Sequence, residues 1–124
     1  MTGVLNVDTI ADNAGTGPVT LTKQEAAKAW VNYKGTTTNE VRDSLNVASV
    51  TDVATGSFTV NYSNSFNNSS YAATGSVDGT GVVSGAVLEI NSYGTGSLGL
   101  RSMHSNTTNT DMPTISADIH GDLA

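Results

Sequence analysis

The stretch that decides the fold is SFTVNY at residues 57–62, in which apolar residues alternate strictly with polar ones. A period of two is typical of a β-strand with one face buried and the other in water. The stretch KAWVNY at residues 28–33 repeats the pattern, but Trp30 and Val31 place a large apolar side chain on each side. We therefore expect both faces of this second strand to be buried.

Turn signals divide the rest of the chain into short strands. Glycine, asparagine, aspartate and threonine cluster at residues 35–39, 78–79, 93–96 and 109–113. Between and around these turns lie apolar or alternating runs at residues 45–50, 71–77, 82–90, 97–103 and 114–119. About seven short strands with this punctuation predict an all-β body, an antiparallel β-sandwich or jelly roll.

The first residues differ from the body. We expect residues 1–21 to form an extended docking arm, joined to a body over residues 22–124. Thr22 and Glu25 have the spacing of a capping box, which predicts one short helical turn at the junction. The arm carries six apolar residues that we expect to contact a partner: Val4, Leu5, Val7, Ile10, Val19 and Leu21.

An isolated apolar strand of this kind exposes backbone groups that pair readily with the edge of a sheet. We expect the arm to dock onto a neighbouring subunit or another protein by strand addition. The alternative is that the arm folds back on its own subunit as an ordinary edge strand.

The composition limits the core that one chain can build. Thr, Ser, Asn and Gly make up nearly half of the 124 residues, whereas aromatic residues are 6% and charged residues 13%. Thr favours strands, and Gly and Asn favour turns. Because apolar residues are few for a domain of this size, we expect neighbouring copies to complete the burial in a homo-oligomer.

Charge and cysteine content exclude several kinds of partner. The net charge is −6 and only five residues are Lys or Arg, so no basic surface for nucleic acid is expected. No apolar run is long enough to span a membrane, and we expect no signal peptide because the N-terminus lacks a basic region and an apolar core. The chain has no cysteine, which excludes disulfides and thiolate zinc sites.

Three segments of the body form a recognisable set: KAWVNY at 28–33, VRDSLNVASVTD at 41–52 and GSFTVNY at 56–62. The set resembles a module of bacteriophage tail-fibre and related virion proteins, common in marine and cyanobacterial phages. Residues 5–10 and 15–24 also look like segments found before that module. The resemblance covers residues 4–77 and implies a trimeric, non-enzymatic virion component made in the host bacterial cytoplasm.

In the resembling proteins the module usually ends a long shaft, whereas here a short arm precedes it. We therefore expect a short fibre or spike module, attached to another virion protein through its arm and presenting loops to a host glycan or receptor. The alternative is a capsid decoration protein, a cement protein or head fibre that clamps or ornaments the head shell. A glycan-processing enzyme is a remote third hypothesis, because neither a nucleophile elbow nor a paired-acid site is visible.

Few residues are candidates for chemistry, and we expect no catalytic, cofactor-binding or metal-binding residue. His104 and His120 are the two histidines, and neither belongs to a ligand cluster. Residues 106–111 offer oxygen atoms, Asp111 included, but lack the spacing of a calcium loop. The pattern GTGSLG at residues 94–99 matches a phosphate-binding fingerprint, but a strand is expected after it where a helix is required.

Aromatic residues can stack on the sugar rings of a host glycan when they lie at the surface. Those that occupy strand positions are expected in the core: Trp30, Tyr33, Phe58, Tyr62 and Tyr71. Phe66 and Tyr93 lie in polar or glycine-rich loops. These two are therefore the predicted surface contacts.

Overall fold

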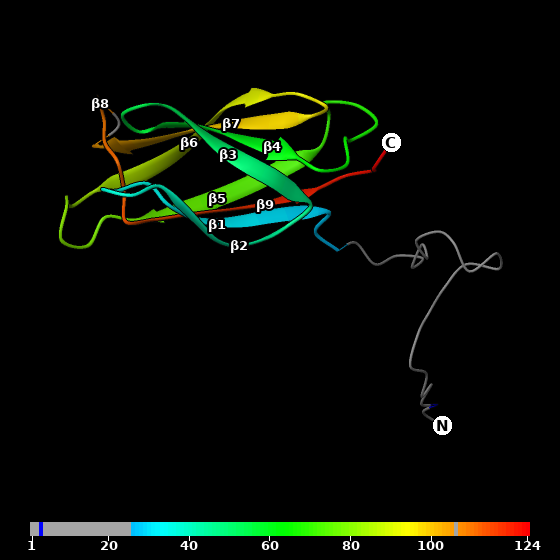
Figure 1. Cartoon of the computed structure of the whole chain (residues 1–124), viewed down its shortest axis with the longest axis horizontal. Helices are drawn as coiled ribbons and strands as arrows, with labels where there is room; N and C mark the ends of the chain where they lie inside the picture. Colours follow the sequence, from blue (N-terminus) through cyan, green and yellow to red (C-terminus); the bar gives the residue numbers. More distant parts are fainter. Residues whose placement is uncertain (1–2, 4–25, 106) are drawn as a thin grey trace.

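A computed structural model describes residue 3, residues 26–105 and residues 107–124. Over these residues the chain forms nine strands and no helix. The strands build two antiparallel sheets that pack face to face (Figure 1), so the predicted all-β sandwich is confirmed. The predicted arm, Gly3 apart, and the helical turn at residues 22–25 lie outside the described residues.

The first sheet has the strand order β2-β1-β9-β5. Its strands are β2 at Glu40–Leu45, β1 at Ala29–Lys34, β9 at Thr114–His120 and β5 at Ala72–Asp78. The strand that opens the body therefore pairs with the strand that closes it, with Val31 opposite Ala117. This pairing brings both ends of the described body to one end of the sandwich.

The second sheet has the order β3-β4-β7-β6. Its strands are β3 at Val47–Ala54, β4 at Ser57–Tyr62, β7 at Ser97–His104 and β6 at Ala86–Tyr93. A two-residue strand, β8 at Thr108–Asn109, pairs with the end of β7. Apart from the hairpins β1-β2, β3-β4 and β6-β7 and the short β7-β8 pairing, consecutive strands lie in different sheets.

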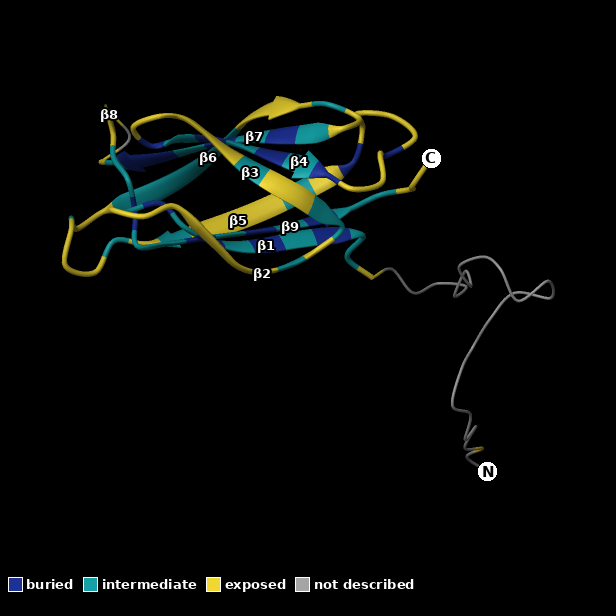
Figure 2. Ribbon diagram, viewed as in Figure 1, coloured by how far each residue is buried: buried dark blue, intermediate teal, exposed yellow. Residues whose placement is uncertain are grey.

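The core lies between the sheets and is built from every second residue of the inner strands (Figure 2). In β4 the buried residues are Phe58, Val60 and Tyr62, as the alternation predicts. Each large apolar side chain that is fully buried contributes about 1.5–3 kcal/mol relative to exposure. The remaining core residues come mainly from β1, β7 and β9: Ala29, Val31, Tyr33, Leu98, Leu100, Ile115, Ala117 and Ile119.

The prediction that both faces of β1 are buried is wrong. Ala29, Val31 and Tyr33 are buried against the second sheet, whereas Trp30 on the opposite face is only partly buried. The outer face of the first sheet has no covering layer among the described residues, so Trp30 lies at the surface of the sandwich.

Residues 45–50, predicted as one strand, are divided by a corner at Asn46. Its φ of 55° turns the chain from β2 in the first sheet to β3 in the second. Asparagine tolerates this left-handed conformation better than most residues. The Asn46 side chain also accepts a bond from the Asn64 backbone NH (2.7 Å) and donates to the Asn64 carbonyl (3.0 Å), which fixes the corner.

The strand predicted at residues 82–90 begins later, at Ala86. Val82 and Val83 are apolar but belong to a turn, in which both backbone NH groups donate to the Gly79 carbonyl at 2.9 Å. The predicted strand was too long at its start because Val82 and Val83 are apolar. Their hydrogen bonds to Gly79 place them in a turn instead.

The two long sides of the sandwich differ. On the side formed by β5 and β6, Leu88 packs directly over Gly75. The opposite side is formed by the edge strands β2 and β3, which have no further strand partner among the described residues. We call it the open side, because three of its apolar residues are exposed: Val41 at 38%, Leu45 at 47% and Val53 at 61%.

Candidate functional site

The chain enters the body at the end of the sandwich where β9 leaves it (Figure 1). The Lys28 backbone NH donates to the Ile119 carbonyl at 2.8 Å, just before β1 begins. The C-terminal segment crosses the same end, where the Ala124 NH donates to the Ser65 carbonyl at 2.9 Å. We call this the arm end, because whatever precedes residue 26 emerges here. The six apolar arm residues predicted to dock lie outside the described residues.

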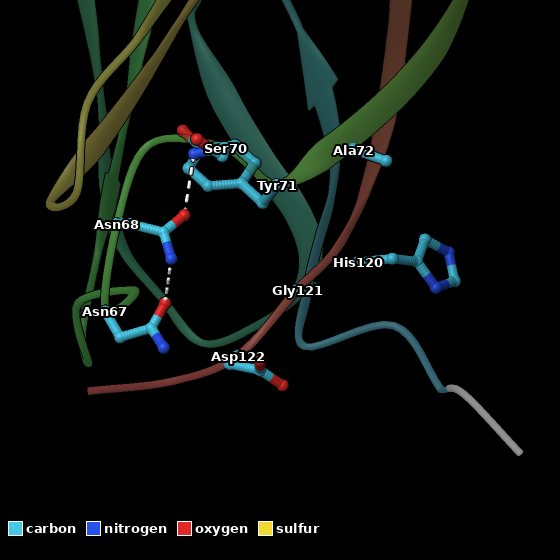
Figure 3. A pocket seen from close by; sticks show the side chains of 8 residues that line it. All are labelled: Asn67, Asn68, Ser70, Tyr71, Ala72, His120, Gly121 and Asp122. Atoms are coloured by element: carbon cyan, nitrogen blue, oxygen red, sulfur yellow. Dashed lines mark hydrogen bonds between the residues drawn. The ribbon is translucent and has the colours of Figure 1, made fainter. Parts of the chain in front are cut away.

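A surface hollow of about 350 Å³ lies at the arm end (Figure 3). Asn68 organises one wall, because its side chain accepts a bond from the Ser70 NH (2.8 Å) and donates to the Asn67 carboxamide (2.7 Å). Most side chains of the lining are polar, which suits hydrogen bonding to a polar partner. The lining residues are Asn67, Asn68, Ser70, Tyr71, Ala72, His120, Gly121 and Asp122.

An aromatic cluster lies beneath the hollow. The Phe66 ring centroid is 4.9 Å from that of Tyr62 and 4.5 Å from that of Tyr71. The Tyr71 hydroxyl donates to the Gly94 carbonyl at 2.9 Å, and the Tyr62 hydroxyl donates to that of Tyr71 at 3.2 Å. Burial raises the pKa of both tyrosines, so both stay neutral at ordinary pH and serve packing.

The prediction of Phe66 as a surface contact is wrong, because its side chain is 1% exposed. Its backbone NH donates to the Thr95 carbonyl and it bridges to Leu123, so the polar loop folds over the end of the core. Tyr93 is 43% exposed and lies 5.4 Å from the Tyr71 ring. Its role as a contact stays a prediction.

A second group of side chains lies on the outer face of the first sheet. Trp30 is opposite Leu45 on β2 and Asp118 on β9, and Asp118 is opposite Thr74 on β5. We call these four residues the Trp30 row. His120, two positions from Asp118 on the same face, connects the row to the hollow at the arm end.

Hydrogen bonds hold the carboxylate of the Trp30 row in place. Asp118 Oδ1 accepts from the Thr74 hydroxyl at 2.8 Å, and Asp118 Oδ2 lies 2.9 Å from His120 Nε2. These bonds, first that of Thr74 and then that of His120, lower the pKa of Asp118. The carboxylate is therefore ionised at neutral pH. Its side chain is 48% exposed, so water also stabilises the charge.

The Trp30 row was missed because Trp30 was assigned to a buried face. One signal pointed to the surface: Trp30 shares its strand parity with Asn32 and Lys34, which are polar. No comparable signal places Thr74 and Asp118 beside Trp30, because they are distant in the sequence and meet only through strand register.

The other residues considered for metal or phosphate binding form turns and strands of the sandwich. Asp111 accepts a bond from the Gly56 NH at 2.7 Å, which fixes the turn between β3 and β4. Residues 94–96 connect β6 to β7, and residues 97–99 begin β7, so a strand and not a helix follows the turn. Within the described ranges, no three His, Asp or Glu side chains are grouped in a way that would hold a metal ion.

None of the known protein families, curated proteins or solved structures compared with this chain matches it. The described part of the chain contains no helix of the length and apolarity needed to cross a membrane.

Proposed function

We propose that this chain is a non-enzymatic structural protein of a bacteriophage virion, a short trimeric fibre or spike module attached through its N-terminal arm. The observation that carries the proposal is the open side, where Val41 and Val53 remain exposed on unpaired edge strands. Burial of these residues by further copies would supply the apolar contacts that the thin core of one chain lacks. The virion class is supported by the resemblance of residues 28–62, which form most of β1 to β4.

The two ends of the sandwich fit the two tasks of such a module. The arm end carries the chain entry and the hollow, and suits attachment to another virion protein (Figures 1 and 3). The far end carries the connections at residues 35–39 and 79–85 and, on either side of β8, residues 105, 107 and 110–113 (Figure 1). These loops are largely exposed and polar, so we assign them the contact with a host surface. Tyr93 belongs to the arm end and is a less suitable host contact than predicted.

Deletion of residues 2–20 tests the proposal in the phage that encodes the chain. The truncated protein should fold as a β-rich oligomer yet be missing from purified particles, measured by quantitative mass spectrometry. Thr38→Ala, in an exposed loop of the far end, is the matched control and should incorporate normally. Normal incorporation of the truncated protein would contradict attachment through the arm, and absence of the full-length chain from particles would overturn the virion role.

The copy number in the same experiment separates the proposal from its alternative. A fibre or spike is present in a few to a few tens of copies per particle. A capsid decoration protein, which would use the same arm end and open side against the head shell, is present in hundreds.

A further inference from the structure

Trp30 lies on the outer face of the first sheet, opposite Leu45 and Asp118. The neighbouring outer-face positions on β9 and β5 are occupied by short side chains, with Ser116 opposite both Asn32 and Ser76, and Ala72 opposite His120. Trp30 is only partly buried, and Leu45 beside it is 47% exposed. Trp30 is thus a partly accessible aromatic side chain on a face where the positions of β9 and β5 are mostly polar.

Fixed hydrogen-bonding groups surround Trp30. Each oxygen of Asp118 accepts one bond, from Thr74 or His120, and keeps a second lone pair for another donor. On the same face Arg42 donates to the carboxamide oxygen of Asn32 at 3.4 Å, which orients that side chain. The polar groups are thus held in place before any ligand arrives, which lowers the entropy that binding must overcome.

We propose that the Trp30 row is a binding site for a neutral saccharide. The apolar face of a sugar ring stacks on Trp30, and its hydroxyl groups donate to the Asp118 carboxylate. Charge favours the neutral class: the ionised Asp118 lies in the row itself, the Arg42 guanidinium on the same face is held away from it at Asn32, Thr114 and the Pro113 carbonyl, and the chain carries a net charge of −6. An acidic sugar would meet like charge at this surface.

This inference deepens the proposed attachment to a host and moves the contact from the loops to a sheet face. The saccharide site depends on the proposed function only for the identity of its ligand as a host glycan. Its test uses the purified chain alone, so saccharide binding and particle incorporation can fail independently. The competing role for Trp30 is a subunit contact, since aromatic residues are also common in interfaces.

The chain contains a single tryptophan, so tryptophan fluorescence reports on this site alone. The full chain is titrated with neutral oligosaccharides of glucose, galactose and N-acetylglucosamine, and with sialyllactose as the acidic comparison. We expect a saturable change in emission for at least one neutral sugar, with a dissociation constant on the order of 1 mM. Asp118→Asn should weaken binding about tenfold, because it removes the charged acceptor.

Variants that lack the indole are followed by calorimetry and by ligand-observed NMR. Trp30→Ala should abolish binding, and Trp30→Phe should retain part of it. Asn61→Ala, on the outer face of the second sheet, is the matched control and should bind like the natural chain. Circular dichroism and light scattering confirm the fold and the mass of each variant.

Three results of the binding measurements would overturn the proposal. They are the lack of a saturable response to every neutral sugar, tighter binding of sialyllactose than of the neutral sugars, and a folded Trp30→Ala variant that binds normally. A fall in the oligomer mass of Trp30→Ala would show instead that the ring is a subunit contact, and would equally reject the saccharide site.

Discussion

The two long sides of the sandwich have the same architecture, an edge strand from each sheet, but opposite surfaces. On the β5-β6 side Val77, Val87, Leu88 and Ile90 are partly buried, and Tyr93 at the end of β6 is 43% exposed. On the open side Val47 and Val50 are partly buried, whereas Val41, Leu45 and Val53 are exposed. Along the middle of the β5-β6 side the apolar residues are thus covered within the chain, whereas the open side leaves exposed apolar residues on both of its edge strands.

The difference between the two sides comes from a few residues on each edge. Gly75 lacks a side chain, so Leu88 can lie over β5 and close that side. On the open side, β2 and β3 are joined by Asn46 alone, and each strand is irregular in its pairing with β1 or β4. Bulges and charges on edge strands discourage uncontrolled pairing. The exposed Val41 and Val53 are therefore the proposed contact with further copies, on an edge whose bulges and charges discourage other pairing.

A side chain at position 75 should destabilise the packing between β5 and β6. A Cβ there would lie 2.5 Å from Leu88 Cδ2 and 2.6 Å from the Ser116 carbonyl oxygen. Gly75→Val should lower the free energy of unfolding by about 2–3 kcal/mol, measured in urea. Gly96→Ala is the control, because its nearest neighbour would be Ser65 Oγ at 3.7 Å, and it should change little. Equal stability of the two variants would contradict the packing of Leu88 over Gly75.

Two variants separate the contributions of the backbone conformation of Asn46 and of its hydrogen bonds to the stability of the corner. Asn46→Ala loses both the favourable left-handed conformation and the bonds to Asn64, and should cost about 1–2 kcal/mol. Asn46→Gly keeps the conformation and loses only the bonds, so it should cost less. A larger loss for the glycine variant, measured in the same urea titrations, would show that the conformation of the corner is not what matters.

Strands with one buried face and one solvent-exposed face could be predicted from the sequence. The alternation in β4, β7 and β9 identified these strands to within a residue or two, because burial imposes a period of two. The break at Asn46 could not be predicted, since a single residue in the left-handed conformation leaves little trace in the pattern. The loop at residues 79–85 was misassigned because Val82 and Val83 are apolar.

The candidate site was harder to predict than the fold. Trp30, Thr74 and Asp118 come from three strands that are distant in the sequence, and only the register of β1, β9 and β5 brings them together. Phe66 was assigned to the surface because its neighbours in the sequence are polar. Its burial depends on the C-terminal segment that crosses the arm end, which no local pattern reveals.

The smallest expected effect concerns pH and the Trp30 row. The pKa of Asp118 is lowered in the folded chain, so its bonds stabilise the fold above the ordinary value of 3.8 and are lost as the pH falls through the lowered pKa. Because the carboxylate is exposed, the contribution should stay below about 1 kcal/mol. The difference in Tm between the natural chain and Asp118→Asn should be full at pH values well above 3.8 and should shrink as the pH falls below 3.8. A constant difference would contradict the stabilising role of these bonds.

The oligomeric mass tests the meaning of the open side most directly. Size-exclusion chromatography with light scattering at micromolar concentration should give the mass of three chains of 12.7 kDa for the natural protein. Val53→Asp places a charge at the most exposed apolar residue of the open side, so it should leave the fold intact and reduce the mass to that of one chain. A monomeric natural protein, or an unchanged trimer of Val53→Asp, would contradict the account.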